Sequence, residues 1–244
     1  MSEYDRERRA LDRWRPGQRW YHPAMASVVI RASRFVMQRL NHLVIEGGER
    51  FEALLERGDR GLLTFSNHVS LFDDPLLVCN FGLPGYRDVR WVAADAINFF
   101  GSGPRSWLFT AGKAVPVVRG AGLKQPGLHF LADRLREGAW VHIFPEGGRT
   151  RDPLGLMQPS FKPGIGRLIA GTNPVALPFY HHGMHEVLPV GTSAPRRGKT
   201  VRILFGEAMQ FAAGETPDTI TARCYEALSA LESQLHPARA TVTA

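Results

Sequence analysis

A histidine and an aspartate separated by four residues, His68 and Asp73, are a pair that could carry out acid–base chemistry. They lie between two apolar runs, residues 61–65 and 76–81. On an ideal helix their side chains would be about 140° apart, so they can meet only if the segment between them is a loop. A neutral histidine held by an aspartate can remove a proton from a hydroxyl group. The alternative is an ordinary loop histidine followed by acidic residues that cap a helix.

The residues around this pair predict a strand, a loop and a helix in succession. The apolar run before His68 predicts a buried strand. Pro75 suits the first position of a helix, where its missing N–H is not needed, and Asp74 is then expected to be the N-cap. Because open α/β sheets carry their functional residues at the carboxyl ends of strands, we expect His68 and Asp73 at that edge.

A second stretch with chemical potential follows the apolar run 140–144. It consists of a glutamate, two glycines and two arginines, namely Glu146, Gly147, Gly148, Arg149 and Arg151. Glycines allow a ligand to approach the backbone closely, and successive amides in such a turn can bind an anion. Arginines can pair with phosphate through two hydrogen bonds. The alternative is a tight turn that carries a solvated cluster of charges.

The composition bounds the class of protein. Hydrophobic residues make up 44% of the 244 residues, which predicts a folded chain with a substantial core. The two cysteines, Cys79 and Cys224, exclude a disulfide framework and form no metal-ligand pattern. No apolar run reaches the roughly 18 residues of a membrane span. A Gly-x-Ser-x-Gly elbow, a P-loop and a His-Glu-x-x-His motif are also missing, which argues against those hydrolase, nucleotide and zinc sites.

The net charge of +7 is concentrated near the N-terminus, where the first 40 residues contain nine arginines and four acidic residues. Such a segment can bind nucleic acid or an anionic lipid surface. Residues 24–43 predict an amphipathic helix, with Arg31, Arg34 and Arg39 outside its apolar stripe. Tryptophans precede this helix, which fits an interfacial membrane anchor. The alternative is a helix packed on the domain with a solvated basic face.

Alternating strand and helix patterns predict an α/β fold, a single domain with a mixed, mostly parallel sheet flanked by helices and an N-terminal basic amphipathic helix. We expect an N-terminal segment at 1–40, the main domain at 41–236 and a frayed tail at 237–244. Strands are expected at 43–46, 61–65, 89–93, 114–118, 140–144, 175–180 and 200–205. Further helices are expected at 51–57, 128–135, 164–170 and 220–235. The aromatic stretch 97–109 predicts half-buried helix and loop, or alternatively a surface that lines an acyl chain or dips into a membrane.

The two motifs together, His68-x4-Asp73 and then Phe144-Pro145-Glu146-Gly147, resemble the glycerophospholipid acyltransferase family. Two further blocks, residues 112–119 and 173–178, match in the family's order. Over about residues 40–207 the nearer resemblance is to the tafazzins, which are phospholipid–lysophospholipid transacylases. The Gly-Arg-Thr sequence after Gly147 is instead more similar to the lysophosphatidate acyltransferases.

This resemblance implies roles for individual residues. His68 would be the general base, and Asp73 would hold its ring and stabilise the imidazolium. No side-chain nucleophile is required, because the acceptor hydroxyl attacks directly. The expected substrate-binding residues are Arg119, Glu146, Gly147, Gly148, Arg149, Lys113 and Asn67.

Several of these residues have specific expected partners. Arg119 is the first choice for the acceptor phosphate, ahead of Arg149 and Lys113, although it could equally end an edge strand in water. Glu146 would bind acceptor hydroxyls or orient an arginine, and the alternative is a structural pair with Arg149. The amides of Gly147 and Gly148 are candidates for the oxyanion site.

The predicted function is therefore transfer of a fatty acyl chain onto a lysophospholipid hydroxyl, in tafazzin-like phospholipid remodelling such as that of cardiolipin. One alternative is a 1-acylglycerol-3-phosphate acyltransferase that uses acyl-CoA or acyl-carrier protein. Another is a non-catalytic basic protein that binds membranes or nucleic acid, but the basic residues do not continue as a stripe through the domain.

The expected surroundings follow from the same observations. No cofactor and no metal are expected, with acyl-CoA or acyl-carrier protein possible as a co-substrate. The expected partners are phospholipid, lysophospholipid and a membrane surface, without nucleic acid. Only four of the 30 basic residues are lysine, and the acidic residues near the N-terminus argue against a transit peptide. We therefore expect a peripheral protein on the cytoplasmic face of a bacterial inner membrane.

Overall fold

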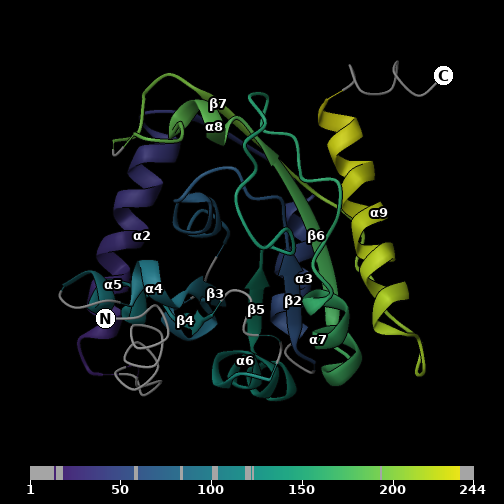
Figure 1. Ribbon diagram of the computed structural model, residues 1–244. Coiled ribbons are helices and arrows are strands. Elements are labelled where there is room, and N and C mark those ends of the chain that lie inside the picture. The colour runs from purple at the N-terminus through teal and green to yellow at the C-terminus, as the bar shows by residue number, and fades with distance from the viewer. Residues whose placement is uncertain are drawn as a thin grey trace.

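The computed structural model describes residues 14, 19–57, 60–82, 85–100, 104–118, 122, 124–192 and 194–236. Within these residues a seven-stranded sheet has the order β1-β7-β6-β2-β5-β3-β4 (Figure 1). The strands are β1 (His42–Glu46), β2 (Leu62–Phe65), β3 (Trp91–Asp95), β4 (Ala114–Val117), β5 (Trp140–Ile143), β6 (Val175–His182) and β7 (Thr200–Phe205). All seven predicted strands are present, with ends that differ by at most a few residues.

The sheet is mixed and mostly parallel, as predicted. Every neighbouring pair of strands is parallel except β6 and β7. The central strands β2 and β5 are buried along their whole length, which explains their continuous apolar sequences. The carboxyl ends of β2, β5, β6, β3 and β4 consequently meet at one edge of the sheet.

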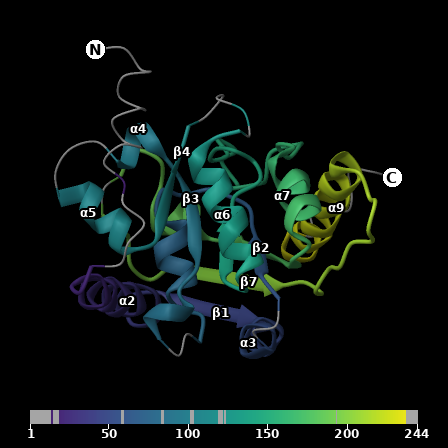
Figure 2. The ribbon, with the colours of Figure 1, turned by 90° about the horizontal axis from the view of Figure 1, so that it is seen from below.

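Helices cover both faces of the sheet (Figure 2). The longer helices are α2 (His22–Gln38), α3 (Gly48–Arg57), α5 (Pro104–Ala111), α6 (Pro126–Arg136), α7 (Gly164–Thr172) and α9 (Pro217–Leu235). The short ones are α4 (Ala96–Phe99), α8 (Met184–Val187), the π-helix η1 (Asp74–Val78) and the 3-10 helix η2 (Tyr86–Asp88). One core lies between the sheet and helices α6, α7 and α9, and a second lies under α2, α3 and η1.

The segment after β2 begins its helix earlier than expected. The helix η1 starts at Asp74, so Asp74 is its first residue and not its N-cap. Asp73 occupies the N-cap position, but its side chain makes no capping hydrogen bond to the helix. The Asp74 carboxylate is drawn away because it pairs with Arg90, whose Nε lies 2.7 Å from Oδ1. A single turn of π-helix is a rare feature that often occurs at functional sites.

The predicted amphipathic helix near the N-terminus is α2, which is shorter than the expected 24–43. Its buried positions are His22, Ala26, Ser33 and Met37, whereas members of its apolar stripe remain exposed, Val28 by 65% and Phe35 by 56%. Among the described residues no helix is both long and apolar enough to cross a membrane. Most of residues 1–20 and the predicted tail 237–244 lie outside the described residues.

Candidate active site

The loop after β2 brings His68 and Asp73 together. Nδ1 of His68 lies 2.9 Å from Oδ2 of Asp73, and the backbone amides of Val69 and Ser70 donate to the same oxygen at 2.7 and 2.8 Å. Burial by itself raises the pKa of the Asp73 carboxyl, but His181, His68 and the Ser70 amide outweigh it and leave that pKa lowered. Asp73 is therefore an ionised carboxylate that holds one nitrogen of the His68 ring.

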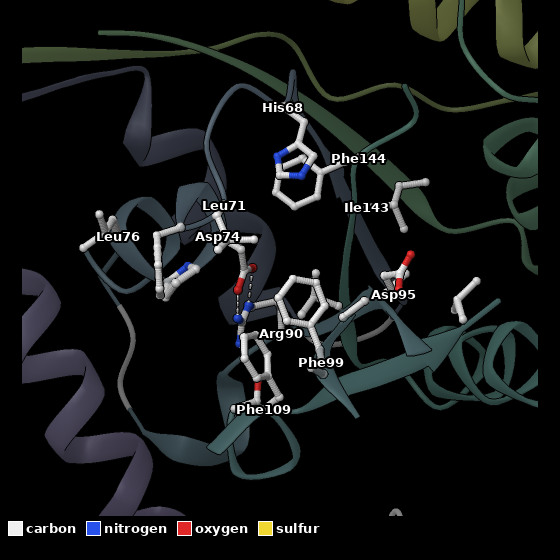
Figure 3. Close-up of a pocket in the computed structure, with 18 of the residues that line it drawn as sticks. His68, Leu71, Asp74, Leu76, Arg90, Asp95, Phe99, Phe109, Ile143 and Phe144 are labelled. Atoms are coloured by element: carbon white, nitrogen blue, oxygen red, sulfur yellow. Dashed lines mark hydrogen bonds and ion pairs between the residues drawn. The ribbon is translucent and has the colours of Figure 1, made fainter. Parts of the chain in front are cut away.

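The ring of His68 is positioned against a second motif residue. It stacks on Phe144 with 4.1 Å between ring centroids and 21° between the planes (Figure 3). The side chain retains 15% exposure and lines a cavity. Because Nδ1 is occupied by Asp73, Nε2 is the nitrogen that can take a proton from a bound substrate.

The backbone of His68 is held by Glu146. The His68 amide donates to Oε1 of Glu146 at 2.7 Å, and the Gln158 amide donates to Oε2 at 2.6 Å. Glu146 is 1% exposed, and burial raises its pKa to about 7. Both carboxylate oxygens accept backbone amides, and among the described residues Glu146 forms no ion pair with Arg149. The predicted contact with acceptor hydroxyls stays a prediction. Glu146 supports the loop that carries His68.

Asn67 is likewise part of the support. Its side chain forms two hydrogen bonds with the backbone of His181, at 2.9 and 3.0 Å, and its carbonyl oxygen lies 3.0 Å from His181 Nε2. Asn67 has no measurable exposure, so the predicted contact with substrate is not supported. The His181 ring lies 3.7 Å from Asp73, and burial lowers the pKa of His181. This second histidine is therefore a neutral neighbour of the dyad.

The cavity beside His68 has a volume of about 850 Å³. Its apolar walls come from α2, η1, β3, α4, α5, β4 and β5, and include Val29, Leu76, Val92, Phe99, Phe109 and Ile143. An ion pair between Asp74 and Arg90 also faces it (Figure 3). Arg90 additionally donates to the carbonyl of Gly112 at 2.8 Å, and burial lowers its pKa to about 9. The Arg90 guanidinium therefore stays charged at neutral pH, and its pair with Asp74 ties η1 to the residue that precedes β3.

Cationic side chains from the second motif and from the segment that precedes α7 line the same cavity, and they are Arg149, Arg151 and Lys162. The stem of Lys162 crosses Gly147, since a Cβ on that glycine would lie 2.9 Å from Cγ of Lys162. Gly147 adopts φ +72°, a conformation that favours glycine. Its amide donates to the Phe144 carbonyl at 3.2 Å, so the predicted oxyanion role is not supported for Gly147. Gly148 lines the cavity.

The other two predicted phosphate contacts are Lys113 and Arg119. Lys113 is 2% exposed, and its Nζ donates to the Val89 carbonyl at 2.9 Å, so it is a buried structural lysine. Burial lowers its pKa to about 8. Arg119 lies outside the described residues. Among the described residues no group of three or more His, Cys, Asp or Glu side chains is arranged to bind a metal ion.

Residues 42–182, which contain both motifs and the dyad, match the family model described as Acyltransferase. The chain belongs to the acyltransferase family. This acyltransferase is 34% identical to Tafazzin of Drosophila melanogaster over 80% of its own length and 53% of the relative. It is 37% identical to the protein named Taffazin of Dictyostelium discoideum over 61% of its own length and 54% of the relative. The N-acylphosphatidylethanolamine synthase of Arabidopsis thaliana is 34% identical over 62% of this chain and 56% of that protein.

These comparisons bear on family and fold. The acyltransferase spans about half the length of the curated relatives it matches. Its fold matches the crystal structure of the 1-acyl-sn-glycerophosphate acyltransferase from Thermotoga maritima with a TM-score of 0.65, at 20% identity, over 96% of this chain and 88% of the other. The predicted α/β fold and the predicted family are confirmed.

Sequence reasoning did not identify Lys162 or the ion pair between Asp74 and Arg90 at the cavity. Lys162 is one of only four lysines and precedes a Pro-Gly pair, and these two features are only a weak sequence signal of a functional residue. The partnership of Asp74 with Arg90 had no signal, because it depends on how η1 packs against the start of β3.

Proposed function

We propose that this acyltransferase moves a fatty acyl chain onto the hydroxyl of a lysophospholipid. The observation that carries the proposal is the contact of His68 Nδ1 with Asp73 at 2.9 Å, where His68 lines an apolar cavity of about 850 Å³. A cavity of this size and lining suits an apolar ligand with a few polar groups at one end. The relatives named as tafazzins support a phospholipid as the acyl donor.

The chemistry follows from the orientation of His68. Nε2 takes the proton of the acceptor hydroxyl as the hydroxyl oxygen attacks the carbonyl carbon of the donor acyl ester. The tetrahedral intermediate then collapses, the bond from the carbonyl carbon to the donor oxygen breaks, and Nε2 returns the proton to that oxygen. The products are an acylated acceptor and a donor that has become a lysophospholipid. Asp73 keeps Nδ1 protonated and stabilises the imidazolium between the two steps.

The acceptor phosphate is bound by the cations at the cavity. Among the described residues, Arg149 and Lys162 form no ion pair with an acidic side chain, and both line the cavity with His68. Arginine can offer two parallel hydrogen bonds to a phosphate, and lysine adds a compact charge. Arg119 stays a candidate on the resemblance alone, and Gly148 stays a candidate for the oxyanion site.

We also propose that the protein works at a membrane surface as a peripheral protein. Helices α2 and α5 pack together and expose large apolar side chains, with Phe35 exposed by 56%, Trp107 by 63% and Leu108 by 43%. Arg31 of α2 and Arg39, which follows this helix, are exposed as well. An apolar surface with nearby cations suits an anionic lipid interface, and it lies beside the cavity that α2 helps to line. The cytoplasmic face of a bacterial inner membrane is the proposed location.

A thioester-dependent acylation of 1-acylglycerol-3-phosphate is the second candidate. The observation in its favour is the Gly148-Arg149-Thr150 sequence, whose arginine lines the cavity. In that reaction acyl-CoA or acylated acyl-carrier protein is the co-substrate. The acceptor oxygen forms the new ester bond, the carbon–sulfur bond of the thioester breaks, and the departing sulfur receives the proton from His68 as a free thiol.

The test is mass-spectrometric detection of acyl transfer from an isotope-labelled phospholipid to a lysophospholipid, without CoA, by wild type and by His68→Ala. We expect transfer by wild type and a decrease of about 10²–10⁴-fold in the variant. A parallel reaction receives acyl-CoA and lysophosphatidate. Transfer only with the thioester would replace the first candidate by the second, and undiminished transfer by a folded His68→Ala variant would remove His68 from the mechanism.

A further inference from the structure

A buried glutamate of the C-terminal helix α9 points toward the segment that supports the catalytic loop. Glu232 has no measurable exposure, although it sits on a helix whose opposite side faces solvent. Its Oε1 accepts the backbone amide of Met157 at 2.8 Å and the hydroxyl of Tyr180 at 3.1 Å. A buried carboxylate is costly unless it is hydrogen-bonded, and these two donors from outside α9 offset that cost.

The amide next to that of Met157 is bonded to the second buried carboxylate. The Gln158 amide donates to Oε2 of Glu146 at 2.6 Å, and the amide of His68 donates to Oε1 at 2.7 Å. The side chain of Gln158 also donates to the carbonyl of Gly148 at 2.8 Å. Two consecutive amides are thus held by two carboxylates, Glu232 from α9 and Glu146 from the loop after β5.

These contacts form a continuous path from α9 to His68. The path runs from Glu232 through the peptide of Met157 and Gln158 to Glu146 and then to the backbone of His68. Every residue on it before His68 is buried or half-buried, so water does not readily replace these bonds. A loss at Glu232 frees the 157–158 segment, and this changes where Glu146 holds the loop.

We propose that Glu232 is a positioning residue for His68, acting through the 157–158 segment and Glu146. The proposal deepens the proposed acyl transfer and rests on it. Glu232 lies beyond residue 182, where the match to the family model ends, so that match does not assign it a role. Small displacements of a catalytic group cost rate more than they cost substrate binding.

The primary variant is Glu232→Met, which keeps a side chain of similar length but removes the acceptor. We expect kcat for acyl transfer to fall about ten-fold with little change in KM. Glu232→Gln keeps an acceptor oxygen at the same distance and should retain most of the wild-type kcat. If Glu232→Met does not fold, Glu232→Asp replaces it, because the shortened carboxylate keeps the charge and withdraws the acceptor.

A matched control separates positioning from general stability. Leu228→Ala also removes buried contacts of α9, so it should lower Tm, but it should leave kcat unchanged because Leu228 is not on the path. The decisive comparison is a double-mutant cycle with Glu146→Gln. If Glu232 acts through Glu146, then Glu232→Met should change kcat by less than about two-fold in the Glu146→Gln background.

Hydrogen exchange of the His68 amide provides a readout that does not depend on activity. We expect faster exchange of the peptide that contains this amide in Glu232→Met and wild-type exchange in Leu228→Ala. Unchanged exchange together with unchanged kcat, or effects of Glu232 and Glu146 that multiply independently, would overturn the proposal. If wild type transfers no acyl chain, the proposed function fails, and the exchange comparison still decides whether Glu232 holds the His68 loop.

Discussion

The Nδ1 side of the His68 ring and its cavity side differ in chemistry and in how their residues are bonded. On the Nδ1 side, Asp73 accepts two backbone amides in addition to the ring. On the cavity side, most of the lining is apolar, and Arg149 and Lys162 provide cationic groups. The first side can hold one geometry, whereas the second can accept a long flexible ligand. The two sides should therefore respond differently to substitution.

The two adjacent aspartates provide the largest contrast. Asp73→Asn should lower kcat by about 10²–10⁴-fold, because the amide cannot stabilise the imidazolium or keep Nδ1 protonated. Asp74→Asn should instead lower the free energy of unfolding by about 3 kcal/mol, because Arg90 loses its buried partner, and should leave kcat within about ten-fold of wild type. Steady-state kinetics and urea denaturation of both variants measure kcat and the free energy of unfolding. An equal loss of kcat in the two variants would mean that Asp73 and Asp74 do not differ in role.

Glu146, which accepts the backbone amide of His68, predicts a pH dependence of stability. Its pKa in the fold is raised from 4.5 to about 7 by burial. Between those values the folded protein binds more protons here than the unfolded chain, so the folded state loses stability as the pH rises through this window. The loss amounts to about 3 kcal/mol between pH 4 and pH 8.

The measurement is urea denaturation of wild type and Glu146→Gln across that pH range. The Glu146→Gln variant lacks this titration. Relative to wild type, its free energy of unfolding should therefore increase as the pH rises. A difference that does not vary with pH would mean that folding leaves the pKa of Glu146 unchanged.

The cations on the cavity side should change substrate binding more than chemistry. Arg149→Ala and Lys162→Ala should each raise KM for the lysophospholipid about ten-fold and leave kcat nearly unchanged, because each removes a charge-assisted hydrogen bond to phosphate. Lys124→Ala is the control, since Lys124 is exposed and does not line the cavity. Saturation kinetics on detergent-dispersed lysolipid provide both parameters. A loss confined to kcat would mean that these residues act in the chemical step and not in substrate binding.

The smallest effect is expected at the outer surface of α2 and α5. Phe35→Glu and Trp107→Glu should weaken binding to anionic vesicles about five-fold each, since less apolar area enters the interface. Ala230→Glu adds the same charge to the exposed side of α9, far from these helices in Figure 2, and should leave vesicle binding close to that of wild type. Sedimentation with vesicles measures the partition, and activity on detergent-dispersed lipid should persist in all three variants.

Much of the fold could be predicted because its signals are local. Continuous apolar runs such as 61–65 and 140–144 are the strands β2 and β5, buried on both faces. The meeting of His68 with Asp73 was also predictable, because the two residues are close in sequence and can meet only across a loop. The family followed from the order of the motifs, and the match over residues 42–182 confirmed it.

The roles of individual polar residues were decided by contacts across the fold. Asn67, Glu146 and Lys113 look like ligand-binding residues in the sequence, but their partners are the backbone groups of His181, Gln158 and Val89. A local pattern cannot show that a distant amide or carbonyl will occupy a side chain.

The sequence by itself determined the alternation of strands and helices, the pairing of His68 with Asp73 and the family, because each depends on residues close together in the chain. Only the tertiary structure decided which charged groups face the cavity and which support it. Asp73 and Asp74 are chemically identical neighbours, yet one meets His68 and the other meets Arg90. The physical reason is that hydrogen bonding and burial depend on which surfaces the folded sheet brings together. A side chain that is already hydrogen-bonded to a buried partner is not available to a substrate.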